Sequence, residues 1–401
     1  MSTPVPLSTP AQTSEDVIDR LLQWPAGHAT LAVRHQRDKV VVATQGSYDG
    51  LFDAALPGPS LAERLLVALS IAELSGSAVL VAHYRAQLQT LAATAPLTPA
   101  QQAALEGQPQ DGVQADTRLH AILTFARTLA LRPVEGDKAA LLRLPAAGLS
   151  TPEVVALAQL IAFVAYQVRV VAGLQALAAL PVGGEAAQTA PAAAEAPFVH
   201  PAHLPKPGEP VRVNGYTSET LGWKAWLPVL ALEQASPEQL AVLEASHPAA
   251  KTSDYYLTLV HQPRILQERS VAFNAIMYAP GGLSRAEREL ASAVVSRING
   301  CVYCASVHAQ RFEQLAKRND VIYQVFTDPH GAGTNARERA IVQASIDLTL
   351  NPGQFGAAQL QAVQAAGLSA LEVLDLIHAV AIFAWANRLM LNLGEAVVPG
   401  G

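Results

Sequence analysis

Apolar residues recur along this chain at the three-to-four-residue spacing of amphipathic helices, and no convincing alternating strand pattern competes with it. In the first half, this spacing predicts helices at 14–23, 60–74, 77–93, 99–105, 115–131, 136–143 and 150–179. In the second half, it predicts helices at 236–246, 253–260, 262–278, 284–298, 301–318, 334–349, 357–366 and 369–394. The pattern therefore predicts an all-α fold.

The two halves of the chain carry the same helix signals at matching positions. SLAERLLVALSIAELSG at 60–76 aligns with SRAERELASAVVSRING at 284–300, and AAGLSTPE at 146–153 aligns with AAGLSALE at 365–372. In all four segments a Ser-x-x-Glu capping box opens a helix, because the hydroxyl and the carboxylate satisfy free amides of the first turn. The unit is too long for a solenoid repeat, so we expect two homologous helical domains in tandem.

A change in composition places the boundary between these domains. Residues 181–210 are rich in Pro, Ala and Gly and lack a helical apolar period, which is typical of a linker. We therefore expect a first domain at 1–180, a linker at 181–210 and a second domain at 211–401.

Composition and charge narrow the class of protein. Half of the 401 residues are apolar, 15% are charged, and the net charge of −6 comes with no basic run, which argues against nucleic acid or an anionic membrane as a partner. No stretch of about 18 uninterrupted apolar residues predicts a membrane span. The first 16 residues lack the features of a secretory signal and are expected to form a short disordered arm, so we expect a cytoplasmic protein.

The only two cysteines of the chain, Cys301 and Cys304, lie three residues apart in RINGCVYCASVHAQRF at 297–312. Asn299-Gly300 is expected to end one helix and Cys301 to open the next, where free amides and the helix dipole stabilise a thiolate. Cys304, one turn further in, is expected to be the less exposed of the two. A zinc site would need more ligands of this kind, so we favour a redox-active dithiol over a metal-binding or buried structural pair.

Two further groups on the flanking helices suit proton transfer. His308 lies four residues beyond Cys304 on the same helix face, where it can hydrogen-bond the thiolate or relay its proton. Glu289 lies twelve residues before Cys301 among apolar neighbours, so it is expected to face inward. Burial would raise the pKa of this carboxyl and make it a useful proton acceptor near neutrality.

The spaced motif Glu289-x11-Cys301-x2-Cys304-x3-His308 resembles the signature of the alkylhydroperoxidase D-like proteins of the carboxymuconolactone decarboxylase superfamily. The wider stretch RAERELASAVVSRINGCVYCASVHAQRF and the tail GLSALEVLDLIHAVAIFAWANRLMLNLGE look like its peroxidase-related branch. The resemblance covers about residues 210–401. The first half resembles a cysteine-less member of the superfamily, so the chain looks like a fusion of two such units.

The resemblance implies an all-helical fold and cysteine-based reduction of hydroperoxides. Cys304 would attack the peroxide and become a sulfenic acid, Cys301 would condense with it and then meet the reductant, and Glu289 with His308 would form the proton relay. It implies a hydroperoxide substrate and an external dithiol reductant, lipoyl- or thioredoxin-like, with no metal or organic cofactor. It also implies a homo-oligomer, with a trimer of this fused chain imitating a hexamer.

One departure from the family pattern lies between the cysteines. Tyr303 occupies the position where well-characterised members have a second histidine, and a phenol is a poorer proton shuttle at pH 7. Two alternatives to the peroxidase remain open. One is a decarboxylase or isomerase that uses acid–base groups without a thiol, and the other is a non-enzymatic redox-sensing or binding protein whose disulfide changes its assembly.

The first half has lost every reactive group of the motif. In the register of the aligned helices, Leu65 stands for Glu289, and Ser77, Leu80 and Tyr84 stand for the two cysteines and the histidine. The first copy is therefore not expected to catalyse a thiol-dependent reaction. Arg169 and Arg388 recur at matching points of both copies, so a structural role is expected for these buried arginines.

Overall fold

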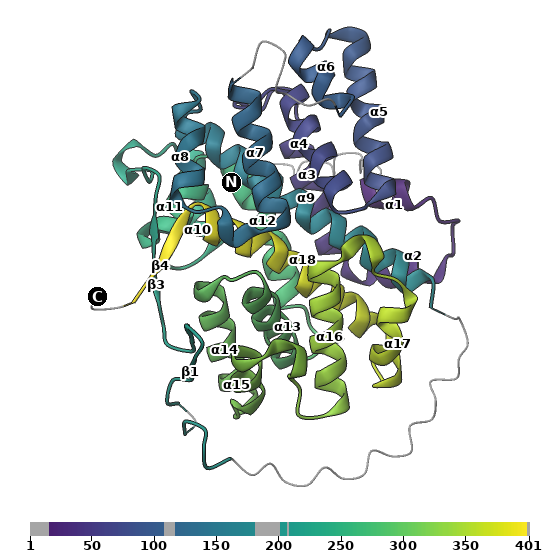
Figure 1. Ribbon diagram of the computed structural model, residues 1–401, viewed down its shortest axis with the longest axis vertical. Coiled ribbons are helices and arrows are strands. Elements are labelled where there is room, and N and C mark those ends of the chain that lie inside the picture. Colours follow the sequence, from purple (N-terminus) through teal and green to yellow (C-terminus); the bar gives the residue numbers. More distant parts are fainter. Residues whose placement is uncertain (1–15, 108–116, 181–200, 207, 399–401) are drawn as a thin grey trace, which may run out of the picture.

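A computed structural model describes residues 16–107, 117–180, 201–206 and 208–398, and this part of the chain is helical almost throughout (Figure 1). The first half contains α1 (Val17–Leu22), α2 (Ala29–Arg34), α3 (Asp38–Leu51), α4 (Leu61–Leu74), α5 (Ala78–Thr94), α6 (Pro99–Leu105), α7 (Thr117–Leu131), α8 (Lys138–Ala146) and α9 (Thr151–Ala178). The second half contains α10 (Pro237–Ser246), α11 (Asp254–Leu259), α12 (Pro263–Met277), α13 (Arg285–Ile298), α14 (Val302–Ala316), α15 (Asp320–Thr327), α16 (Ala336–Leu350), α17 (Ala357–Ala365) and α18 (Ala370–Asn392). The predicted all-α class is confirmed.

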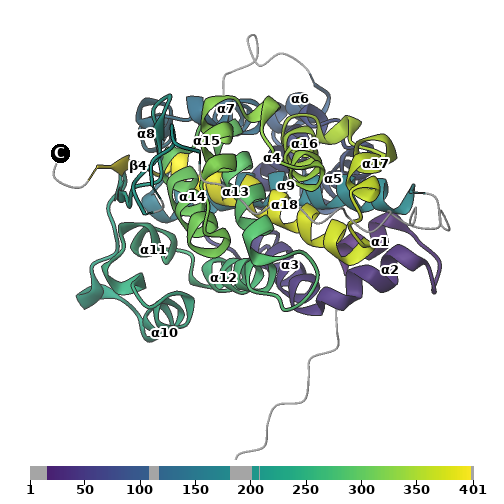
Figure 2. The ribbon, with the colours of Figure 1, turned by 90° about the horizontal axis from the view of Figure 1, so that it is seen from below.

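The sequence pattern missed α2, α3 and α15. Helix α3 carries two glycines and the β-branched run Val40–Val42, which lower its intrinsic helix propensity. Packing against α12 stabilises α3 all the same, because a Cβ atom at Gly46 would lie 2.6 Å from Cδ of Glu268. Figure 2 shows α3 and α12 side by side. Tertiary contact therefore outweighs local preference here.

Four short strands correct the expectation of no strand at all. β1 (Arg212–Val213) pairs antiparallel with β2 (Tyr216–Thr217), and β3 (Gly222–Ala225) pairs antiparallel with β4 (Gly394–Val397). In the second pair Trp223 lies opposite Ala396, and its indole Nε1 donates to the Met390 carbonyl at 2.9 Å. The β3–β4 pair attaches the start of the second half to its end.

Helices α9 and α18 cross at the centre of the molecule and pack along one another (Figure 1). The contact is close, since a Cβ atom at Gly173 would lie 2.4 Å from Cγ2 of Ile377, and Trp385 donates to Gln159 at 2.8 Å. One apolar core contains buried residues from both halves. Both helices are long and apolar enough to span a membrane by length and composition, but their most apolar windows are 100% and 83% buried inside the protein.

The halves exchange equivalent contacts across this centre. Arg169 on α9 donates to the Thr349 carbonyl at 2.5 Å, and Arg388 on α18 donates to the Ala130 carbonyl at 3.1 Å. Ala130 and Thr349 occupy matching positions of the two aligned copies, as do the two arginines. The contacts are therefore reciprocal, as in an approximately two-fold arrangement. The domain boundaries 1–180 and 211–401 themselves stay a prediction.

The expected linker and N-terminal arm are described only at their ends. From 181–210, residues 201–206 and 208–210 lie against the second half, where Leu204 is buried and the Pro205 carbonyl accepts from Asn319 at 3.1 Å. From the arm, the structure describes Asp16, whose side chain caps α1. The other residues of both segments lie outside the described part of the chain.

Candidate active site

The cysteine motif lies at the turn between α13 and α14. Asn299 ends α13, Gly300 has a φ of +79° that favours glycine, and Cys301 is the N-cap of α14. The sulfur of Cys301 accepts from the backbone amide of Cys304 at 3.5 Å. The side chain of Asn299 donates to Asn387 on α18 at 3.0 Å. The predicted helix–turn–helix is confirmed, and α18 holds its turn in place.

Both cysteines are free thiols, and both are buried, with 1% of Cys301 and 4% of Cys304 exposed. The expectation that Cys301 is the more exposed of the two is therefore wrong. The chain segment after the linker lies over the start of α14, where Ser306 donates to the Glu219 carbonyl. A bulky reductant thus has no open surface at either sulfur in this conformation.

The Cys301 thiol has a strongly perturbed pKa. Burial raises the pKa of Cys301 well above its ordinary value, and the hydrogen bond and charge of Cys304 raise it further. The amides at the start of α14 oppose these effects but do not overcome them, so the expected stabilisation of a thiolate at Cys301 is not found. Cys301 therefore holds its proton at neutral pH.

Glu289 is completely buried on α13 and faces inward, as expected. Its carboxylate accepts from Arg285 at 2.5 Å and lies 2.5 Å from Nδ1 of His308. Burial raises the pKa of Glu289, but the charges and hydrogen bonds of His308 and Arg285 outweigh burial and hold this pKa below its ordinary value. The expectation of a raised pKa is therefore wrong, because burial came together with the interactions of His308 and Arg285.

His308 lies one turn beyond Cys304 on α14, and its side chain is nearly buried. Its ring stands edge-on to Phe383 of α18, with 4.3 Å between the ring centroids. Next to an ionised Glu289, Nδ1 carries the proton and donates it to the carboxylate, which leaves Nε2 to accept one. Within the described residues no hydrogen bond joins His308 to Cys304, so of the two expected roles a proton relay is the one that the geometry leaves open.

Tyrosines surround the cysteine pair. Tyr303 is partly buried, and burial together with a negative charge on Cys304 raises its pKa. Tyr255 on α11 is almost completely buried, its hydroxyl has no hydrogen-bond partner among the described residues, and the guanidinium of Arg269 lies 5.4 Å from its ring centroid. Sequence reasoning missed Tyr255 and Arg269, and no local signal marks them, because only tertiary packing brings Tyr255 near the thiols.

The corresponding place in the first half is filled with apolar and aromatic side chains. Leu65, Leu80 and Tyr84 are buried, and the Tyr84 hydroxyl donates to Gln167 of α9. Ser77 is the N-cap of α5, just as Cys301 is the N-cap of α14. The first copy therefore repeats the helix–turn–helix without the dithiol, the acid or the histidine.

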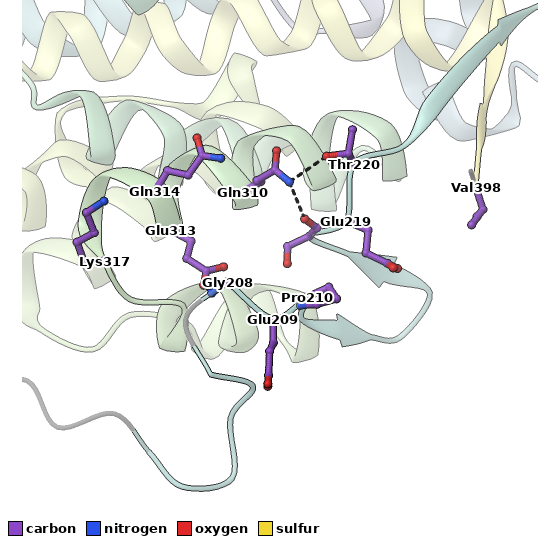
Figure 3. A pocket seen from close by; sticks show the side chains of 11 residues that line it. Gly208, Glu209, Pro210, Glu219, Thr220, Gln310, Glu313, Gln314, Lys317 and Val398 are labelled. Carbon is purple, nitrogen blue, oxygen red and sulfur yellow. Dashed lines mark hydrogen bonds between the residues drawn. The ribbon is translucent and has the colours of Figure 1, made fainter. Parts of the chain in front are cut away.

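The four motif residues do not line a surface cavity of about 610 Å³ that lies nearby on α14. It lies between α14 and the segment before β3 (Figure 3). It is lined by Gly208, Glu209, Pro210, Ser218, Glu219, Thr220, Gln310, Glu313, Gln314, Lys317 and Val398. Gln310 spans it with hydrogen bonds to Thr220 and to the Ser218 carbonyl. Across the described ranges, no group of three or more His, Cys, Asp or Glu residues is placed to hold a metal ion.

Comparison with known proteins gives a family match and similar solved structures. Residues 266–347, which include all four motif residues, match the Carboxymuconolactone decarboxylase family. An alkylhydroperoxidase AhpD core structure, an uncharacterized peroxidase-related protein from Ralstonia eutropha JMP134, is 25% identical, covers 40% of this chain and 85% of its own, and has a TM-score of 0.36. An uncharacterized peroxidase-related protein from Silicibacter sp. TM1040 is 22% identical, covers 40% of this chain and 86% of its own, and has a TM-score of 0.34. No curated protein matches the sequence.

Proposed function

We propose that the second half of this chain, whose residues 266–347 match the Carboxymuconolactone decarboxylase family, reduces hydroperoxides with the Cys301–Cys304 dithiol. The observation that carries the proposal is the hydrogen-bonded pair of Glu289 and His308, which lies on the two helices that also form the cysteine turn. A structural dithiol has no need of a buried acid–base pair on the same helices.

The first step is attack by Cys304 on the peroxide. Nε2 of His308 takes the Cys304 proton, directly or through water, while Glu289 stabilises the imidazolium that forms. The thiolate attacks the terminal oxygen of the hydroperoxide, so that an S–O bond forms as the O–O bond breaks. The alkoxide leaves and recovers the proton from His308, which gives an alcohol and a sulfenic acid on Cys304.

The second step closes the disulfide. The Cys301 sulfur attacks the Cys304 sulfur, and the hydroxyl leaves as water with the Cys301 proton. The raised pKa of Cys301 fits this role, because a resolving thiol need not be ionised while the first step takes place. An external dithiol then reduces the disulfide and is itself oxidised, which returns both cysteines to thiols.

The proposal extends to partners that follow from this chemistry. A hydroperoxide is the oxidant and a small or protein-borne dithiol is the reductant, which requires a reducing compartment such as the cytoplasm. Both sulfurs are buried. The reductant therefore reaches Cys301 only if the segment around Glu219, which lies over the start of α14, moves away, or if the reductant is a small molecule. We include a homo-oligomer, with a trimer as the expected state, in the proposal.

The test uses the purified full chain, cumene hydroperoxide and dithiothreitol. We expect one equivalent of peroxide to remove two free thiols, and excess dithiothreitol to sustain peroxide consumption. Cys304→Ser should abolish consumption, whereas Cys301→Ser should allow one turnover and leave a sulfenic acid that dimedone traps. Ser77→Ala, at the position of the first copy that matches Cys301, is the control and should leave the rate unchanged.

Two outcomes would contradict the peroxidase. If Cys304→Ser consumes peroxide as fast as the wild type, the thiol is not the reacting group, and a thiol-free decarboxylase or isomerase becomes the better hypothesis. If the disulfide forms once but no dithiol reopens it, the pair acts as a redox sensor rather than as a catalyst.

A further inference from the structure

Two buried arginines face one cavity between the halves of the molecule. Arg169 on α9 is 4% exposed and Arg388 on α18 is 2% exposed. Both line a cavity of about 430 Å³. None of the residues that line it is an aspartate or glutamate.

The cavity lies where the two copies exchange contacts. Its wall contains matching residues from each half, among them the pairs Leu131 with Leu350 and Pro133 with Pro352. The two arginines are themselves such a pair. The site therefore contains the same kind of group from each half of the molecule.

The positive charge at this site has no full counter-charge in the described part of the chain. Arg169 donates to the carbonyls of Ala165 and Thr349, and Arg388 donates to the carbonyls of Leu129, Ala384 and Ala130. The carbonyls at the ends of α7 and α16 supply partial negative charge only. Burial lowers the pKa of Arg388 well below its ordinary value, and the nearby charge of Arg169 lowers it further.

One donor at the site is also unused. Nε of Arg169 is buried and has no hydrogen-bond partner in the described residues, which costs free energy unless a ligand or water supplies an acceptor. Guanidinium groups stay protonated even when buried and pair best with planar or tetrahedral oxyanions. Two such groups and an unused donor at one cavity thus call for negatively charged oxygen atoms.

We propose that this cavity binds a small oxyanion, a carboxylate or a phosphate group, held between Arg169 and Arg388. This role is separate from hydroperoxide reduction, and none of the four motif residues lines the cavity. Asn299 does line it, two residues before Cys301, so a bound anion would lie directly behind the cysteine turn.

The test measures binding to the full chain by calorimetry and by thermal shift. Inorganic phosphate and acetate are the two probes, and sodium chloride at matched ionic strength is the reference. We expect saturable binding of at least one probe near one site per chain, weakened at least tenfold in Arg169→Gln. A thermal shift with both probes that is no larger than that with chloride, or binding that Arg169→Gln leaves unchanged, would overturn the proposal.

A second variant keeps the proposal testable if Arg169→Gln fails to fold. Gln354 is exposed at the rim of the cavity, and Gln354→Glu places a carboxylate there. We expect this variant to melt at a higher temperature than the wild type and to lose phosphate and acetate binding. Gln361→Glu, an exposed position on α17 away from the cavity lining, is the matched control. Equal melting temperatures and unchanged anion binding in both variants would contradict the site.

Discussion

Nδ1 of His308 lies 2.5 Å from Oε2 of Glu289, and the two residues come from the two helices that meet at the cysteine turn. Glu289 is completely buried, and its other oxygen is held by Arg285. The carboxylate therefore has no freedom to turn away from the imidazole. This arrangement fixes the tautomer of His308 and leaves Nε2 as the nitrogen that exchanges protons.

Replacing Glu289 with glutamine should slow peroxide consumption by about a hundredfold or more, because general acid–base groups commonly contribute factors of this size. Glu289 acts through His308 and is a positioning residue, so the pH profile is the decisive measurement. We expect the profile of Glu289→Gln to shift relative to the wild type. Glu287→Gln, which removes a capping carboxylate two residues earlier on α13, should leave the profile in place. An unchanged rate and profile in Glu289→Gln would exclude the relay.

The lowered pKa of Glu289 also predicts how stability depends on pH. Because the folded pKa lies below the ordinary value of 4.5, the ionised carboxylate stabilises the fold above that value, and this stabilisation is lost as the pH falls through the folded pKa. The difference in unfolding free energy between wild type and Glu289→Gln should therefore shrink below about pH 4.5. Urea unfolding at several pH values measures it, and a difference that grows on acidification would contradict the lowered pKa of Glu289.

The raised pKa of Cys301 predicts a loss of stability in alkali. A buried thiol stays neutral in the folded protein while the unfolded chain ionises, so its contribution is present below the unfolded pKa and is lost as the pH rises toward the folded pKa. We expect the melting temperature of the wild type to fall between pH 7 and pH 9.5 by more than that of Cys301→Ala. Calorimetric scans of both proteins test this, and an identical fall in the two would count against a buried thiol with a raised pKa.

The helix bounds around this site and the orientation of Glu289 were predictable from the sequence, because both depend on local patterns. The Ser284-x-x-Glu287 capping box and Asn299-Gly300 set the bounds of α13, and the structure places both where expected. The inward orientation of Glu289 followed from its apolar neighbours on one helix. These features depend on residues within one or two turns of each other, which is the range over which periodicity carries information.

The electrostatics of the site were not predictable in the same way. The pKa of Glu289 is set by Arg285, four residues earlier on the same helix, and by His308 on another helix. The sequence indicates that Glu289 is buried, but it does not show which side chains from other helices contact the carboxylate. The exposure of Cys301 depends on a segment nearly ninety residues earlier, whose Glu219 carbonyl accepts from Ser306. Tyr255 was missed for the same reason, since only tertiary packing brings α11 near the thiols.

In each half an arginine forms salt bridges to the glutamates of two capping boxes. The two arginines should contribute similar amounts to the free energy of unfolding. Arg118 bridges Glu63 and Glu153 at 3.1 Å each, and Arg337 bridges Glu287 and Glu372 in the same way. Both arginines are about 30% exposed, so screening limits each link to about 1 kcal/mol.

We therefore expect Arg118→Met and Arg337→Met to lower the unfolding free energy by similar, additive amounts. Because one apolar core spans both halves, a single unfolding transition should report both losses. Denaturant curves of the single and double variants measure this. Two separate transitions, with each variant shifting only one of them, would instead show that the halves unfold independently.

The crossing of α9 and α18 should be intolerant of a single methyl group. An exposed helical glycine replaced by alanine usually gains about 1 kcal/mol from helix propensity. At Gly173 the added Cβ would lie 2.4 Å from Cγ2 and 2.8 Å from Cγ1 of Ile377, and both atoms belong to a buried, branched side chain with little room to move. Overpacking of this kind typically costs about 1–3 kcal/mol, so we expect Gly173→Ala to destabilise the protein despite its better propensity.

A double-mutant cycle separates the clash from any other effect of the substitution. Ile377→Ala alone should cost about 2–5 kcal/mol, because it leaves a cavity in the core. In the Ile377→Ala background the new methyl group has space, so Gly173→Ala should become neutral or stabilising there. Urea unfolding of the four proteins gives the coupling energy. If Gly173→Ala stabilises the wild-type background as much as the Ile377→Ala background, the two helices do not approach each other closely at this crossing.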